Sequence, residues 1–295
     1  MKRTEARGFC GAGDEMEVSS VCLHRGEEPP LNPIVNVFFT HCNLQCVYCQ
    51  NWQISGKKSV EPFHEMAIQE RICDLLPQSG GMLGLVTAAH YADRIPALIE
   101  AIRTRLSSLP TPLGRGVGGE ALTVVYNSGG YESVETLRSL EGLVDVYLPD
   151  LKYMDSDLAA RYSHAPDYPE VAAAALLEMK RQVGGGLITD DRGAACRGMI
   201  VRHLVLPGAT DNSLRCLEWL ADNFNPFTLH LSLMAQYFPP RTGLPAPLDR
   251  TLTADEYAVV TARAEELGFI KGWVQELEAR NNYRPDFDKK DNHFE

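Results

Sequence analysis

Three cysteines stand close together near the N-terminus. The segment HCNLQCVYCQN (41–51) places Cys42, Cys46 and Cys49 in the spacing C-x3-C-x2-C. Thiolates are the ligands that zinc and iron–sulfur clusters prefer. A closed structural zinc site takes four ligands, and no second pair of closely spaced cysteines follows in the chain. Two interpretations stay open: a zinc site completed by His41, or a four-iron cluster whose fourth iron is free for another ligand.

The cysteines follow directly on the first of six segments that are predicted to be strands. Each of these segments is followed by a stretch whose apolar residues have the spacing of a helix. Six β-then-α units imply a parallel sheet with right-handed crossovers, either open and doubly wound or a partial barrel. In both, chemistry belongs at the carboxyl ends of the strands. The predicted strands are 34–39, 82–87, 122–127, 144–151, 198–207 and 228–234, and the predicted helices are 63–76, 94–106, 134–143, 170–183, 213–224 and 254–268.

Length and composition limit the class of protein. The chain has 295 residues, of which 44% are hydrophobic, and these values suit one α/β barrel or two modest domains. A formal net charge of −11 disfavours nucleic acid as a partner. No secretory signal and no apolar run of membrane-spanning length is visible, so we expect a soluble cytoplasmic protein that does not bind a membrane. Its eight cysteines are then thiols or metal ligands rather than disulfides.

We expect three regions along the chain. Residues 1–33 are predicted to form a short, irregular N-terminal extension that ends at the segment GEEPPLNP. Residues 34–270 contain the alternating strands and helices. Residues 271–295 form a polar C-terminal tail, which we expect to be disordered or to face a partner.

The cysteine segment resembles the radical S-adenosylmethionine (SAM) superfamily in three features: the spacing, the aromatic Tyr48 before the third cysteine, and the position after the first strand. The resemblance implies a partial (β/α)6 TIM-like radical SAM barrel. It also implies one 4Fe-4S cluster bound by Cys42, Cys46 and Cys49, with SAM chelated at the fourth iron. In this family an electron from the cluster breaks the C5′–S bond, and the 5′-deoxyadenosyl radical abstracts a hydrogen atom. The protein orients and shields this cofactor chemistry.

Five segments narrow the resemblance to the relatives of pyruvate formate-lyase activating enzyme. The match covers about residues 10–270. It implies an enzyme that makes a radical on a protein or peptide, as a glycyl-radical activase does, or on a small molecule. Flavodoxin or ferredoxin is the expected low-potential electron donor. The segments are FFTHCNLQCVYCQNWQIS, YNSGGYES, VDVYLPDLKYMD, VRHLVLPG and LMAQYFP.

The resemblance also assigns roles to residues of three predicted strands. Asn127 and Ser128 correspond to polar residues near the SAM carboxylate. Asp150 lies near a monovalent cation and Lys152 near SAM. Arg202 faces SAM, and an arginine suits bidentate capture of a carboxylate. The alternative readings are a plain turn for Asn-Ser-Gly-Gly and a surface salt bridge for Asp150 with Lys152.

Two further positions depart from the pattern of the activating enzymes. Those enzymes bind the SAM amino group with Ser-Gly-Gly-Glu, and the corresponding stretch 87–90 is Thr-Ala-Ala-His. His90 could accept a hydrogen bond from an ammonium, or could be a structural residue. Gln236 stands in place of a histidine near adenine or ribose. The altered stretch favours the alternative function, a non-catalytic iron–sulfur or zinc-binding protein.

Overall fold

The parallel sheet is singly wound. The computed structural model describes residues 9–56, 65–108, 122–281, 285–287 and 289. All six predicted strands are present, and consecutive strands are parallel neighbours, so the strand order never reverses as it does in a doubly wound sheet. The strands are β2 (Ile34–Phe39), β3 (Met82–Val86), β4 (Thr123–Ser128), β5 (Val146–Pro149), β7 (Ala195–Leu204) and β8 (His230–Met234).

Two strands that the sequence analysis missed extend this sheet. β1 (Val18–His24) pairs antiparallel with β2, and β9 (Lys271–Val274) pairs in parallel with β8. The prediction of an irregular extension is therefore wrong for residues 18–24. The serines and the histidine of VSSVCLH hide the strand pattern, and β1 is buried because it lies between β2 and helix α2. Within the described residues, no pairing of β1 with β9 closes the sheet into a barrel.

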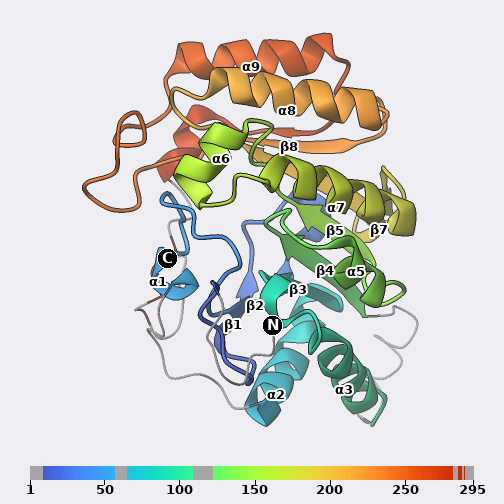
Figure 1. Cartoon of the computed structure of the whole chain (residues 1–295). Coiled ribbons are helices and arrows are strands. Elements are labelled where there is room, and N and C mark those ends of the chain that lie inside the picture. The colour runs from blue at the N-terminus through green and yellow to red at the C-terminus, as the bar shows by residue number, and fades with distance from the viewer. Residues whose placement is uncertain (1–8, 57–64, 109–121, 282–284, 288, 290–295) are drawn as a thin grey trace.

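The helices lie along one side of the curved sheet. Figure 1 shows them following one another from α2 and α3 at the bottom of the view, through α5 and α7, to α8 and α9 at the top. The first two residues of the predicted helix 63–76 lie outside the described residues. The helices that correspond to the six predicted ones are α2 (Glu65–Leu75), α3 (Ile95–Ser108), α5 (Val134–Ser139), α7 (Tyr168–Val183), α8 (Thr210–Asn223) and α9 (Ala254–Glu266).

Three short elements were not predicted. Helix α1 (Trp52–Ser55) follows the cysteine segment, and β6 (Leu187–Thr189) forms a hairpin with β7. Helix α6 (Ser156–Ser163) stands between β5 and α7. The Asp155 side chain caps the start of α6 by accepting hydrogen bonds from the next turn, and His164 ends it in the left-handed conformation.

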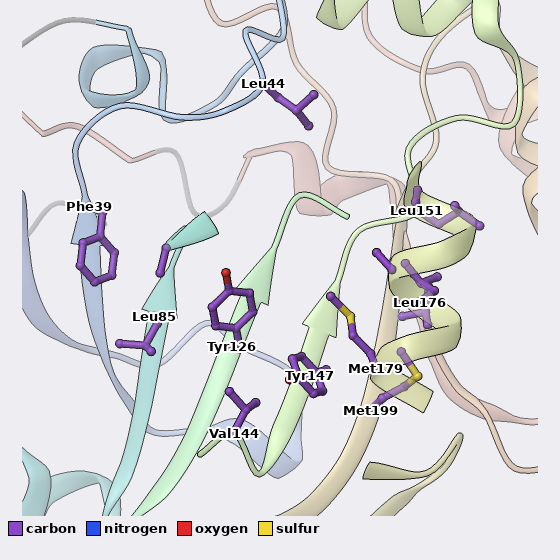
Figure 2. Close-up of a cluster of buried hydrophobic side chains, with 14 of the residues drawn as sticks. Phe39, Leu44, Leu85, Tyr126, Val144, Tyr147, Leu151, Leu176, Met179 and Met199 are labelled. Atoms are coloured by element: carbon purple, nitrogen blue, oxygen red, sulfur yellow. The ribbon is translucent and has the colours of Figure 1, made fainter. Parts of the chain in front are cut away.

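Side chains from the two faces of the sheet form separate cores. The outer face packs under the helices, and Figure 2 shows Tyr147 of β5 close to Met179 of α7 in this layer. The inner face carries a smaller apolar cluster that includes Ile34, Val125 and Ile200. None of the helices in the described part of the chain has the length and apolar character that a membrane crossing requires.

Candidate functional site

A cavity of about 220 Å³ lies at the carboxyl ends of the parallel strands. The segment between β2 and α1 brings all three closely spaced cysteines, Cys42, Cys46 and Cys49, to its wall. Seven of the other residues that the sequence analysis singled out line the same cavity. They are His41, Tyr48, Asn127, Asp150, Lys152, Arg202 and Gln236.

Strand alternation decides which predicted residues reach the cavity. Asn127 lies on the inner face of β4, and its neighbour Ser128 therefore faces the helices. Ser128 is fully buried, donates a hydrogen bond of 2.5 Å to Glu132 Oε2, and accepts one of 2.8 Å from Gly130 N. The structure thus does not bring Ser128 to the cavity. Adjacent residues of one strand cannot both point into it.

His90 also lies away from the cavity wall. The chain leaves β3 in a short 3₁₀ turn, Ala89–Tyr91, which buries the imidazole. His90 Nε2 lies 2.7 Å from the carbonyl oxygen of Thr40, so this nitrogen carries the hydrogen and donates it. Thr87, at the start of the same TAAH stretch, lines the cavity instead, with its hydroxyl 4.0 Å from Cys42 Sγ.

Cys42 and Cys49 occupy surroundings that oppose ionisation of their free thiols. Burial, together with the neighbouring thiols Cys46 and Cys49, raises the pKa of Cys42 to about 12. Burial and Cys46 likewise raise the pKa of Cys49. Three thiolates in one buried site therefore need a positively charged group among them. The cationic irons of a cluster meet this need, so the donor set fits an iron–sulfur cluster.

The described residues contain no group of three or more His, Cys, Asp or Glu side chains arranged around a single metal ion. In a cubane cluster each thiolate binds a different iron atom, so the three sulfur atoms need not surround one common metal position. His41, the proposed fourth zinc ligand, lines the cavity in a left-handed conformation with φ of 66°. Its Nε2 lies 3.7 Å from Glu17 Oε2.

Lys152 is the cation that faces the thiols. Burial opposes its charge, but the Asp150 carboxylate and the sulfur of Cys46 outweigh burial and raise the pKa of Lys152 above its ordinary value. Its ammonium group is paired with Asp150. A Cβ at Gly129 would lie 3.2 Å from Leu44 Cδ1, so the glycine leaves room for this leucine at the cavity wall. Lys152 therefore stays charged at the cavity wall.

Arg202 is held by two acids that the sequence analysis did not single out. Its guanidinium donates to Glu28 at 2.8 and 2.6 Å and also pairs with Glu27. Both glutamates belong to the segment between β1 and β2, and neither spacing nor composition marks them beforehand. They line a second cavity of about 270 Å³, which shares Arg202 and Gln236 with the first.

Gln236 follows β8 and borders both cavities. Its side-chain oxygen accepts a hydrogen bond of 3.2 Å from Gln275 Nε2, just after β9. Its backbone oxygen accepts one of 3.3 Å from Gln50 Nε2, just after the third cysteine. Gln236 therefore links the segment after β9 to the cysteine segment after β2.

The chain is similar to a curated protein of an archaeon and, in part of its fold, to a solved methyltransferase structure. No family model matches the chain. An uncharacterized protein of Methanocaldococcus jannaschii is 29% identical over 277 residues, which cover 90% of this chain and 72% of the relative.

The methyltransferase is the radical S-adenosylmethionine methyltransferase TsrM of Kitasatospora setae. With cobalamin and a [4Fe-4S] cluster bound, it superposes on 68% of this chain at a TM-score of 0.44 and 12% identity. With tryptophan substrate and the SAM analogue aza-SAM bound, the TM-score is 0.44 and the identity 11%. This chain spans 37% and 36% of the two methyltransferase chains.

Proposed function

We propose that this chain is a radical SAM enzyme with a partial (β/α)6 barrel. The observation that carries the proposal is the cavity at the carboxyl ends of the strands, where three cysteines in C-x3-C-x2-C spacing meet polar residues from β4, β5, β7 and β8. When both are bound, a 4Fe-4S cluster and SAM supply the chemistry of the site, which is reductive cleavage of SAM to a 5′-deoxyadenosyl radical. The singly wound, open sheet supports the partial barrel.

The side chains of the cavity have separate tasks in this proposal. Cys42, Cys46 and Cys49 hold the cluster. Lys152 neutralises the carboxylate of SAM as a point charge, and Asn127 and Gln236 offer amides to its polar groups. Arg202 is engaged by two carboxylates, Glu27 and Glu28, whereas Lys152 pairs with Asp150 alone, so Lys152 is the better candidate for the carboxylate of SAM. A monovalent cation beside Asp150 is a further proposed ligand.

The substrate is proposed to be a protein or peptide, as for a glycyl-radical activase, because the five strand-end segments resemble those enzymes. A low-potential donor such as flavodoxin or ferredoxin would reduce the cluster.

An anaerobic assay tests the proposal. The protein is reconstituted with iron and sulfide, reduced with dithionite and mixed with SAM, and 5′-deoxyadenosine is measured. We expect this product from the wild type and none from Cys46→Ala. Protein with a full cluster could instead form no 5′-deoxyadenosine and show the same EPR spectrum with and without SAM. This result would favour the non-catalytic iron–sulfur protein. Stoichiometric zinc with no cluster would favour the zinc protein.

A further inference from the structure

The C-terminal end of α6 holds the cysteine segment at two consecutive residues. Ser163, the last residue of α6, is fully buried, and its hydroxyl donates a hydrogen bond of 3.0 Å to Cys46 Sγ. The carbonyl oxygen of Tyr162 accepts a hydrogen bond of 2.8 Å from Val47 N. A helix 117 positions along the chain thus contacts the middle cysteine directly.

Two tyrosines continue from Ser163 as a chain of hydroxyls. The Tyr153 hydroxyl lies 2.8 Å from Ser163 Oγ and 2.6 Å from the Tyr48 hydroxyl. Each hydroxyl has one hydrogen to donate. Ser163 gives its hydrogen to Cys46, and Tyr153 donates to Tyr48. The three hydroxyls therefore form one buried cluster beside the sulfur.

This chain lies in surroundings of low polarity. Tyr48, Tyr153 and Ser163 are 5%, 0% and 0% exposed. The edges of the rings of Tyr153, Tyr162 and Tyr237 surround the Tyr48 ring, with centroids 6.3 to 6.5 Å away. Burial raises the pKa of both Tyr48 and Tyr153 well above their ordinary values, so both keep their hydrogens. In such surroundings a hydrogen bond is electrostatically stronger than in water.

Apart from the Thr87 hydroxyl, a distant donor 4.0 Å from Cys42 Sγ, the donors to the other two cysteines in the described residues come from nearby positions. Cys42 Sγ accepts a hydrogen bond of 3.4 Å from Leu44 N. Cys49 accepts from the Ser55 side chain and the Asn51 backbone. The contact from α6 therefore distinguishes Cys46 from its two neighbours.

We propose that Ser163 is a positioning residue that makes the reduction potential of a cluster held by Cys46 less negative. This inference rests on the proposed function. Reduction by one electron adds negative charge to the cluster and its thiolates, and a hydrogen bond to a sulfur stabilises the more negative state more strongly. The Tyr153 hydroxyl, 2.8 Å from Ser163 Oγ, fixes the position of the serine hydroxyl beside Cys46.

The experiment is an EPR-monitored redox titration of the reconstituted full chain, with iron and sulfide content measured beside it. For Ser163→Ala we expect the ratio of reduced to oxidised cluster at a given potential to fall about tenfold, which is about 59 mV for one electron. Ser163→Thr keeps the hydroxyl and should restore the wild-type value. Tyr153→Phe should shift the potential in the same direction by less, because Ser163 still donates.

Ser139→Ala is the matched control. Ser139 also ends a helix, α5, but is exposed and bonds to the Thr136 carbonyl, so the potential should not change. A fully loaded Ser163→Ala protein with the wild-type potential would overturn the inference, as would Ser163→Thr matching Ser163→Ala. If Ser163→Ala binds no cluster, an unchanged potential in Tyr153→Phe overturns it.

The two proposals fail in different ways. If the wild-type protein cleaves SAM, and the Ser163 and Tyr153 variants have the same reduction potential as the wild type, the proposed function stands. The inference about Ser163 is then wrong. Wild-type protein that holds no iron–sulfur cluster removes both.

Discussion

Lys152 brings positive charge to a cavity wall that carries three thiols. Lys152→Ala should leave the cluster in place, because the lysine is not a ligand. It should weaken SAM binding about 10- to 100-fold, since a hydrogen bond to a charged group contributes roughly 1.5–3 kcal/mol. Iron content and a SAM titration followed by EPR would measure both effects.

Lys180→Ala provides the matched control for that titration. Lys180 donates to the Asn223 carbonyl and lies over the Phe224 ring, away from the cavity wall. SAM affinity that is the same in Lys152→Ala as in Lys180→Ala would remove Lys152 from the binding site.

Glu132 makes stability depend on pH. Burial raises its pKa to about 7, although Ser128 donates a hydrogen bond to it. The unfolded chain releases this proton near pH 4.5. The folded state therefore binds more protons between these values, and stability falls as the pH rises from about 4.5 through about 7.

Glu132→Gln removes this titration and keeps an acceptor for Ser128. From pH 5 to pH 8 the free energy of unfolding of the wild type should fall about 3 kcal/mol more than that of the variant. Urea unfolding of both proteins at the two pH values would measure the difference. Parallel pH profiles would contradict this assignment.

At the scale of elements, the segment between β1 and β2 is tied to β7 by Arg202. Arg202→Ala leaves Glu27 and Glu28 buried without their cation. Removing one partner of a buried ion pair costs about 3–5 kcal/mol, so we expect a loss of stability of this size in urea unfolding. The defect should appear in the cluster-free protein as well as in the loaded one.

An exposed arginine provides the comparison for this variant. Arg250 pairs with Glu256 at the surface, and Arg250→Ala should cost less than about 1 kcal/mol. Equal stability losses in the two variants would show that the contact of Arg202 with the two glutamates contributes little.

The predicted strands and most predicted helices matched because their signal is local. Runs such as IVNVFF (34–39) and the apolar spacing of 170–183 are visible without any partner. β1 and α6 depend on their surroundings instead. β1 is a strand because β2 and α2 cover it. α6 has only eight residues, fewer than the roughly 11–18 residues over which helical spacing is recognised.

At the scale of the whole molecule, the C-terminal tail is part of the fold. Phe287 is 2% exposed and meets the Phe38 ring edge-on at 5.3 Å, beside Ile54 and Val86. Its backbone nitrogen donates to Gln53 Oε1 of α1 at 3.0 Å. The expectation of a disordered tail is thus wrong for this residue, while residues 282–284, 288 and 290–295 lie outside the described part.

Replacing Phe287 tests the contribution of the tail. Phe287→Ala should reduce the free energy of unfolding by about 3 kcal/mol, because it leaves a cavity between the strands and α1. Phe227→Ala is the control, since Phe227 is 61% exposed. Chemical unfolding that gives the same small change for both phenylalanines would show that the tail contributes little to stability.

The sequence by itself determined the cysteine spacing, the alternation of strands and helices, and the polar residues at the strand ends. These signals are local, because each depends on residues a few positions apart. Tertiary structure decided which residue of a neighbouring pair faces the cavity, and so separated Asn127 from Ser128. It also placed Ser163 on Cys46 and the two glutamates on Arg202. Such contacts join distant segments, and only the packing of the helices and strands brings those segments together.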